Sequence, residues 1–149
     1  MTTTASDTAP QKILYTAKAT VEGGRDGRGR SDDGNLDVAL AKPQAMGGAG
    51  GSGTNPEQLF AVGYAACFLG ALKAVAGKEQ LRVPPETTIQ SEVGFGPRDS
   101  GGFGLAVALH VTMPGIEPAK ARQLVDAAHQ ICPYSNATRG NIPVTLTVG

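Results

Sequence analysis

The amino-acid sequence predicts a single α+β domain made of two β-hairpins, two helices and a closing strand. In several short stretches apolar residues alternate with polar ones, as in half-buried strands, and in two longer stretches they recur at helical spacing. The chain of 149 residues contains neither an internal repeat nor a linker-like segment. We therefore expect one domain over residues 1–149, in which residues 1–11 form a polar, flexible tail.

Composition restricts the partners that the chain can have. Its 13 lysine and arginine residues balance 13 acidic residues, and charged residues make up only 17% of the chain. Such a chain lacks the positive field that concentrates nucleic acid or an anionic membrane, so we expect neither as a partner. The first residues lack the charged start and apolar run of a secretory signal. We expect a cytoplasmic location, where the two cysteines are reduced.

The first predicted hairpin surrounds a glycine-rich segment. Residues 13–21 and 36–40 alternate as strands do, and residues 23–34 form a long connection with three arginines among many glycines. One interpretation of this connection is a solvated basic loop. The other is a backbone that must approach a neighbouring group closely, which glycine permits.

A second glycine-rich segment, at residues 47–53, formally contains G-x-G-x-x-G at Gly48, Gly50 and Gly53. A dinucleotide site also requires a buried parallel strand directly before this motif and an acidic residue at the end of the next strand. Pro43 interrupts the preceding stretch, and Glu79 lies in a polar segment. We therefore do not expect this segment to bind a nucleotide.

The residues that follow predict a buried central helix. Either Thr54 and Glu57 form a capping box, or Asn55 caps the helix with Pro56 at its first position. Residues 59–72 carry no charge, but this run is too short to span a bilayer. Gly77 is expected to end the helix. One apolar face at helical spacing consists of Phe60, Tyr64, Cys67, Phe68, Ala71 and Val75.

The remaining elements follow from turn and helix signals. Residues 88–95 and 105–113 alternate as two strands of a hairpin, with Gly101 and Gly102 at the turn. Pro118 opens a second helix, which Pro133 ends, and residues 142–148 alternate as a last strand.

Cys67 and Cys132 lie on the apolar faces of the two helices, and three uses remain open for them. They could be small core residues, because buried free cysteine is common. They could join His110 and His129 in a Cys2His2 zinc site, although no pair has the short spacing of a zinc finger. They could also form a redox pair.

A redox pair makes a chemical demand on the rest of the chain. Burial on an apolar helix face raises the pKa of a thiol, so Cys67 would be inert unless a cation stabilised its thiolate. Arginine is always charged, and a carboxylate that accepts two guanidinium hydrogen bonds holds it well. The candidates are Arg25, Arg28 or Arg30 for the cation and Glu57 for the carboxylate.

Five motifs between about residues 13 and 148 resemble the organic hydroperoxide resistance (Ohr) branch of the Ohr/OsmC superfamily. They are Gly23-Gly24-Arg25-Asp26-Gly27, Gly53-Thr54-Asn55-Pro56-Glu57-Gln58-Leu59-Phe60, Gly63-Tyr64-Ala65-Ala66-Cys67-Phe68, Gly102-Phe103-Gly104-Leu105 and Cys132-Pro133-Tyr134-Ser135-Asn136-Ala137-Thr138-Arg139-Gly140-Asn141. The last motif favours the Ohr branch over its OsmC relatives.

The resemblance implies an enzyme, a thiol-dependent peroxidase that reduces alkyl, aryl or lipid hydroperoxides to alcohols. It makes Cys67 the peroxidatic cysteine and Cys132 the resolving cysteine, with a Cys67–Cys132 disulfide formed during turnover. It makes Arg25 the partner of the thiolate and Glu57 the residue that orients Arg25. The implied fold has antiparallel sheets packed around a buried central helix, in an intertwined homodimer with active sites at the subunit interface.

The resemblance also implies that no cofactor is bound and that a lipoylated protein or another dithiol re-reduces the disulfide. Phe60, Tyr64 and Phe68 would give the substrate pocket an apolar wall. A strip of small residues on the central helix, Gly63, Ala66 and Gly70, would let a helix of a second subunit pack closely. The alternative to the enzyme is a non-catalytic module that binds a metal through Cys and His or carries apolar ligands.

Helix geometry adds one hypothesis about the dimer. Glu57 and Cys67 are ten residues apart, so on one straight helix their Cα atoms are separated by about 15 Å. Direct contact between them within one chain is therefore not expected. We hypothesise that the Arg25 and Glu57 that serve each Cys67 belong to the partner subunit.

Overall fold

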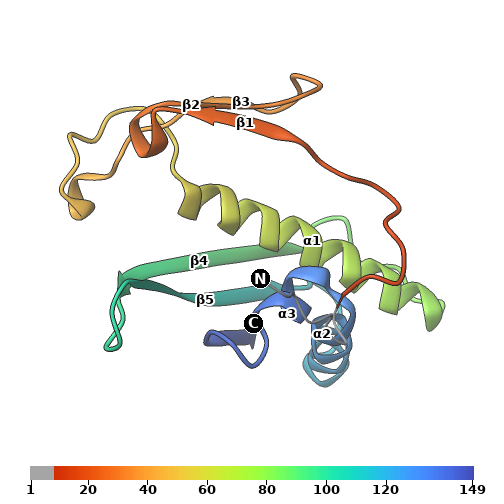
Figure 1. Cartoon of the computed structure of the whole chain (residues 1–149). Coiled ribbons are helices and arrows are strands. Elements are labelled where there is room, and N and C mark those ends of the chain that lie inside the picture. Colours follow the sequence, from red (N-terminus) through yellow and green to blue (C-terminus); the bar gives the residue numbers. More distant parts are fainter. Residues whose placement is uncertain (1–8) are drawn as a thin grey trace. The chain divides into compact units, whose positions relative to one another are not determined.

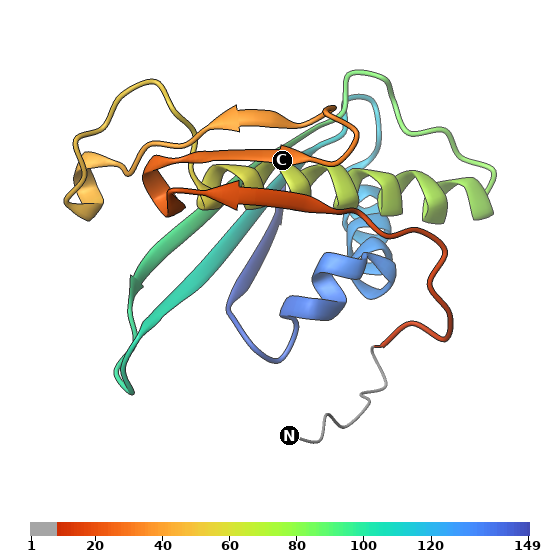
Figure 2. The same ribbon diagram turned by 45° about the horizontal axis from the view of Figure 1, so that its top comes forward.

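A computed structural model describes residues 9–149, which form two compact units divided after Leu59. Residues 1–8, most of the predicted polar tail, lie outside the described residues. Figures 1 and 2 show the elements of each unit in two views. Helices and strands are both present and do not alternate regularly along the chain, so the predicted α+β fold class is confirmed.

The first unit contains an antiparallel sheet in the order β1 (Ala19–Glu22), β2 (Arg28–Ser31) and β3 (Asp37–Ala39). The single-turn 3₁₀ helices η1 (Gly24–Asp26) and η2 (Gln44–Met46) lie between β1 and β2 and after β3. The prediction that residues 23–34 merely connect two strands was wrong, because β2 lies within them. β2 is the central strand, and its backbone pairs with both neighbours, so it needs no alternation of apolar side chains.

Gly27, between η1 and β2, explains part of the glycine content of this segment. A Cβ atom at Gly27 would lie 1.6 Å from the carbonyl oxygen of Glu22, closer than any real side chain approaches. At this position only glycine permits the close approach of the two backbone segments. The group approached is the backbone of the same turn, which carries Arg25.

The central helix α1 (Pro56–Lys78) begins with a cap made by one of the two expected arrangements. The backbone N–H of Gln58 donates to Oδ1 of Asn55 at 2.8 Å, so Asn55 is the capping residue and Pro56 the first helical residue. The hydroxyl of Thr54 instead bonds the side chain of Gln58 at 2.7 Å. Of the two alternatives, the asparagine cap is therefore the one that the structure shows.

α1 has 23 residues and ends one residue after Gly77, so it is longer than the uncharged run that predicted it. Its length and a mean hydropathy of 1.8 over 18 residues would suffice to cross a membrane, as is also true of many core helices. Tyr64, Phe68 and Leu72 have no exposed surface and belong to the hydrophobic core of the second unit. The burial of these residues is that expected of a helix in a protein core.

The sheet of the second unit is mixed. β4 (Thr88–Pro97) and β5 (Phe103–Thr112) form the predicted antiparallel hairpin, whereas β6 (Val144–Val148) runs parallel to β5. The expectation of purely antiparallel sheets was therefore wrong for this unit. Between β5 and β6 the chain crosses through two helices, so it enters β6 from the same end as β5.

These crossover helices are α2 (Pro118–Ile131) and the short α3 (Pro133–Thr138). α2 ends before Pro133 as predicted, but Pro133 is also the first residue of α3, a helix that the sequence did not predict. In both views α2 lies beside the C-terminal half of α1 (Figures 1 and 2). The buried core residues come mainly from α1, β5 and α2: Tyr64, Phe68, Ala71, Leu72, Val75, Ala76, Val83, Val107, Leu109, Val111, Met113, Ala121, Leu124, Val125, Ala128 and Cys132.

Candidate active site

The structure brings the two cysteines together within the second unit, although 65 residues separate them in the sequence. Cys67 lies in the middle of α1 and is half-buried, whereas Cys132 is completely buried between α2 and α3. Their Sγ atoms are 3.4 Å apart, and both thiols are free. A disulfide has an S–S length of about 2.05 Å, so a relative movement of about 1.3 Å would join them.

The backbone around Cys132 fixes its position at the break between the two helices. Its N–H donates to the carbonyl of Ala128 at 2.9 Å and closes α2, while its own carbonyl accepts the N–H of Asn136 at 2.9 Å. Cys132 itself is extended, with φ −63° and ψ 123°, because it precedes a proline. The residue is therefore held by the ends of both helices.

The surroundings of Cys67 do not favour its thiolate by themselves. Burial raises the pKa of the Cys67 thiol above its ordinary value, and the neighbouring Cys132 raises it further. A hydrogen bond from the backbone N–H of Tyr134 lowers this pKa, but by less than burial raises it. The structure therefore agrees with the requirement derived from the sequence: a reactive thiolate at Cys67 needs a cation to stabilise it.

Arg25 and Glu57 form a bidentate ion pair within the first unit. Arg25 lies in η1, and its Nη1 and Nη2 atoms donate to Oε2 and Oε1 of Glu57 at 2.9 and 2.8 Å. Glu57 lies in the first turn of α1, and its side chain is only 12% exposed. The hydrogen bonds with Arg25 hold the pKa of Glu57 below its usual range, so the carboxylate stays charged. The pairing that the sequence predicted is confirmed.

The two other arginines of the glycine-rich segment have different carboxylate partners. Arg28 donates from Nε to Oδ1 of Asp37 at 2.9 Å, on the exposed surface. Arg30 lies 3.6 Å from Glu22 across the β1–β2 pair. Of the three arginines left open by the sequence, Arg25 is therefore the one that pairs with Glu57.

The aromatic residues predicted to form an apolar wall lie on the core side of α1. The rings of Phe60 and Tyr64 stack with centroids 5.8 Å apart, and Tyr134 of α3 packs against both. Tyr64 and Phe68 have no exposed surface. Within the second unit, neither side chain therefore presents surface to a substrate. Tyr134 was not predicted as a site residue, although it lies two positions after Cys132.

A polar cluster next to the cysteines was also missed. The hydroxyl of Tyr64 lies 2.8 Å from Oγ of Ser135 and 3.0 Å from Oγ1 of Thr138. Oγ of Ser135 also lies 2.8 Å from Nδ1 of His129. The one sequence feature that could have indicated this cluster is the position of Ser135, three residues after Cys132. A single serine at that position matches no known sequence motif.

Comparison with known proteins places these groups in a family. The profile described as OsmC-like protein matches residues 48–147. An organic hydroperoxide resistance protein of Xanthomonas axonopodis pv. citri is 59% identical over 140 residues, which cover 94% of this chain and 98% of that protein. The chain belongs to the organic hydroperoxide resistance branch of the OsmC-like family. Organic hydroperoxide resistance protein OhrB of Bacillus subtilis is 49% identical over 134 residues, 89% of this chain and 96% of that protein.

Solved structures of Ohr proteins have the same fold. The crystal structure of OhrB of Bacillus subtilis matches with a TM-score of 0.85 and 48% identity, over 92% of this chain and all of that one. An organic hydroperoxide resistance protein of Vibrio cholerae, crystallised with captopril in one of its active sites, gives a TM-score of 0.89 and 46% identity. The match covers 95% of this chain and 96% of that one. The resemblance and the Ohr/OsmC fold predicted from the motifs are confirmed.

The zinc site considered as an alternative is not assembled within the part of the chain that the structure describes. Among residues 9–149, no three His, Cys, Asp or Glu side chains come close enough to share a metal ion. His110 lies on β5, where its Nδ1 is 2.6 Å from the hydroxyl of Thr147, and His129 bonds Ser135. The two histidines are therefore engaged with hydroxyl groups and do not join the cysteines in a cluster.

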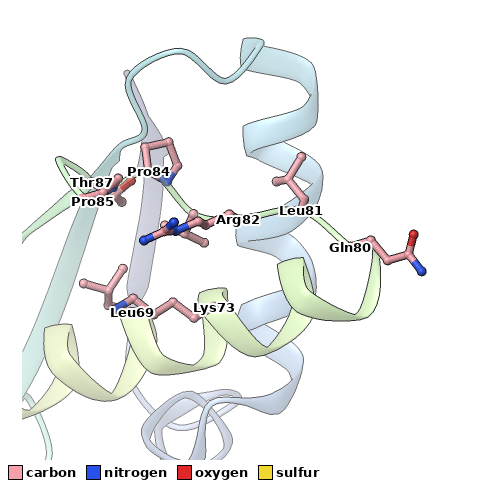
Figure 3. Close-up of a pocket in the computed structure, with 9 residues that line it drawn as sticks. Leu69, Lys73, Gln80, Leu81, Arg82, Pro84, Pro85 and Thr87 are labelled. Atoms are coloured by element: carbon pink, nitrogen blue, oxygen red, sulfur yellow. The ribbon is translucent and has the colours of Figure 1, made fainter.

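The second unit also contains a hollow of about 540 Å³ that lies apart from the cysteines, where α1 leads into β4 (Figure 3). Its lining includes the cationic side chains of Lys73 and Arg82 and the apolar side chains of Leu69, Leu81 and Val83. Neither Cys67 nor Cys132 lines it. This hollow is therefore not part of the candidate site of the Ohr protein.

Proposed function

We propose that this Ohr protein is a thiol-dependent peroxidase that reduces organic hydroperoxides to alcohols. The observation that carries the proposal is the pair of free thiols 3.4 Å apart, with Cys67 half-buried and Cys132 completely buried. An accessible thiol can meet a peroxide, while its buried neighbour is protected until the first has reacted. The pair thus has the order of access that a peroxidatic and a resolving cysteine need.

The proposed chemistry has three balanced steps. The Cys67 thiolate attacks one peroxide oxygen, the O–O bond breaks, and the alkoxide leaves as the alcohol after taking up a proton. The resulting Cys67 sulfenic acid condenses with the thiol of Cys132, forming the S–S bond and releasing water. An external dithiol then exchanges with this disulfide, becomes oxidised itself, and returns both cysteines to thiols.

Arg25 supplies the cation in this proposal, and Glu57 orients it. A guanidinium that donates two hydrogen bonds to one carboxylate is held in a fixed plane. A positive charge held beside Cys67 would oppose the effect of burial and lower the pKa of the thiol. The guanidinium would also stabilise the charge that develops on the peroxide in the transition state, and Arg25 itself would remain chemically unchanged.

The exposure of apolar side chains supports a homodimer. Ile13, Leu14, Tyr15, Val21 and Leu36 are all 46% to 87% exposed. On α1, Val62 is 71% exposed and lines an apolar groove of about 400 Å³ together with Ala65, Ala66 and Leu69. Of the predicted strip of small residues, Ala66 and Gly70 are exposed, whereas Gly63 packs against Tyr134. A second copy of the chain would bury these surfaces.

The homodimer permits the partner subunit to supply Arg25 and Glu57 to each Cys67. Mixed dimers of a Cys67→Ser chain with a Glu57→Ala chain test this sharing. If sharing occurs, one of the two sites in each mixed dimer has all groups intact, and about half of the wild-type activity remains. Complete inactivity of verified mixed dimers would show that each chain supplies its own Arg25 and Glu57.

The reductant is proposed to be a dithiol such as the dihydrolipoyl group of a lipoylated protein, with no cofactor bound by the chain and a cytoplasmic location. A dithiol closes its own disulfide after exchange, so it regenerates the enzyme in one encounter. Steady-state turnover with dihydrolipoamide should exceed turnover with a monothiol at equal thiol concentration. Equal rates with both reductants would contradict this part of the proposal.

The decisive experiment counts thiols. Cumene hydroperoxide is added to the fully reduced protein, and free thiols are titrated against time, with the Cys67→Ser variant as the control. The peroxidase predicts rapid loss of two thiols per chain in the wild type and no rapid loss in the variant. Thiols that survive excess hydroperoxide in the wild-type protein would refute the proposed function.

A further inference from the structure

The hydroxyl cluster beside the cysteines ties together the two segments that carry them. Tyr64 belongs to α1, as Cys67 does, and Ser135 and Thr138 belong to α3, which follows Cys132 directly. Tyr64 and Ser135 have no exposed surface, and Thr138 is 5% exposed. The hydrogen bonds between them therefore join α1 to α3 in the interior, where water cannot replace them.

The Tyr64–Ser135 contact lies close to the cysteine pair in the sequence of both helices. Tyr64 lies three residues before Cys67 on the same helix, and Ser135 lies three residues after Cys132. The 2.8 Å contact between the Tyr64 and Ser135 hydroxyls thus runs beside the 3.4 Å contact between the sulfurs, about one helical turn away. Two contacts side by side fix the rotation of α3 against α1 as well as its distance.

Further hydrogen bonds extend the cluster to the end of α2. His129 lies three residues before Cys132, and its Nδ1 contacts the Ser135 hydroxyl. The guanidinium of Arg139 donates to the backbone carbonyl of His129 and, at 2.8 Å, to Oδ1 of Asn136. Ser135 is therefore bonded on one side to α1 and on the other to α2, and the turn that holds Cys132 lies between these attachments.

The geometry points to Tyr64 and Ser135 as positioning residues that keep the Cys132 sulfur within reach of Cys67 during disulfide formation. The inference rests on the proposed function, because it concerns the condensation of the Cys67 sulfenic acid with the Cys132 thiol. In that step an S–O bond breaks, the S–S bond forms and water leaves. The alternative fate of the sulfenic acid is attack on a second hydroperoxide, which gives a sulfinic acid and one more alcohol.

Two single-atom deletions test the inference. Tyr64→Phe and Ser135→Ala each remove one buried hydroxyl and leave the remaining core side chains in place. Ser91→Ala is the matched control, since Ser91 Oγ is also buried in the second unit but has no hydrogen-bond partner among residues 9–149. Reduced proteins are treated with increasing cumene hydroperoxide, and mass spectrometry measures the ratio of disulfide to sulfinic acid.

We expect the hydroperoxide concentration that converts half of the chains to sulfinic acid to fall about tenfold in Tyr64→Phe and Ser135→Ala, since each loses a buried hydrogen bond. The Ser91→Ala control should match the wild type. The double variant should lose less than the sum of the two single variants, because both substitutions remove the Tyr64–Ser135 contact. A hydroxyl that only stabilised the fold would lower the unfolding temperature without changing this ratio.

A second measurement keeps the inference separate from the peroxidase proposal. Equilibration in a dithiothreitol redox buffer gives the stability of the Cys67–Cys132 disulfide without any peroxide. Both hydroxyl variants should require a buffer about tenfold more oxidising than the wild type does. If Ser135→Ala does not fold, Tyr64→Phe, which keeps its ring in the core, decides alone.

The outcomes are distinct. Wild-type thiols that resist hydroperoxide would refute the peroxidase, and the redox-buffer shift would still test the positioning of Cys132. A wild type that forms the disulfide, together with folded variants that match it in both measurements, would overturn the positioning role alone.

Discussion

The Arg25–Glu57 ion pair allows a quantitative prediction for Glu57→Gln. The substitution keeps the size of the side chain and one carbonyl acceptor, but it removes the negative charge and one of the two hydrogen bonds to the guanidinium. A hydrogen bond to a charged group contributes about 1.5 to 3 kcal/mol. Because the Arg25 side chain is 32% exposed, part of this is screened by solvent. We expect the unfolding free energy at pH 7 to fall by about 1 to 2 kcal/mol.

The effect of Glu57→Gln should also depend on pH. The hydrogen bonds with Arg25 lower the pKa of folded Glu57 below its ordinary value of 4.5, so the unfolded chain takes up this proton first as pH falls. The stabilisation is fully present above pH 4.5 and is lost as pH falls through the folded-state pKa. The difference between wild type and variant should therefore shrink toward zero in acid.

Urea denaturation at several pH values and one fixed protein concentration measures this difference. Asp37→Asn is the control, because the Arg28–Asp37 pair is exposed on both sides and should contribute nothing measurable. A difference between wild type and Glu57→Gln that stays constant from neutral to acid pH would refute the assignment of the effect to the ionised carboxylate. Equal stabilities at pH 7 would refute the estimate itself.

Three further predictions, the last with its own control substitution, test other parts of the structure. Arg25→Ala should raise the pKa of Cys67 and slow peroxide reduction by orders of magnitude, and an alkylation series against pH that gives the wild-type pKa would contradict this. Cys132→Ser should leave the first turnover intact but produce sulfinic acid at Cys67, as mass spectrometry would show, since no thiol remains to condense. Gly27→Ala should destabilise the fold by more than about 3 kcal/mol, because its Cβ would meet the Glu22 carbonyl. Gly24→Ala, at φ +59° with open space around it, should cost only about 1 kcal/mol, and similar melting temperatures for the two alanine variants would contradict the steric argument.

Local signals in the sequence were sufficient for several elements. Asn55 followed by Pro56 predicts the start of α1, and the structure shows the Asn55 cap, because a helix cap depends on only three or four consecutive residues. Gly101 and Gly102 predict the β4–β5 turn, and both adopt positive φ there. These predictions hold because the determining contacts are short in sequence.

Other elements depend on distant parts of the chain and were missed. β2 is stabilised by backbone bonds to strands on both sides, and its residues have no apolar alternation. β6 runs parallel to β5 because α2 and α3 intervene, and Pro133 gives no sign in the sequence that a second helix follows it. A proline is compatible both with the end of one helix and with the first residue of the next.

For the candidate site as well, some features follow from the sequence and others only from contacts between distant residues. The sequence shows the residue types that a redox pair requires, which are two thiols, an arginine and a carboxylate. The family motifs then identify Cys67, Cys132, Arg25 and Glu57 among the alternatives. Chemical identity is a property of the side chain, so the sequence by itself determines which reactions are available. It also determines, through local caps and turns, where α1 begins and which of its faces is apolar.

Only the tertiary structure decided which of these groups meet. In the structure the sulfurs of Cys67 and Cys132 lie 3.4 Å apart. Arg25, and not Arg28 or Arg30, pairs with Glu57. The Tyr64 hydroxyl is buried against Ser135. Each of these contacts joins residues more than 30 positions apart. Such distances are set by the packing of α1 in the core of the second unit and by strand pairing in the first, and no local pattern in the sequence encodes them.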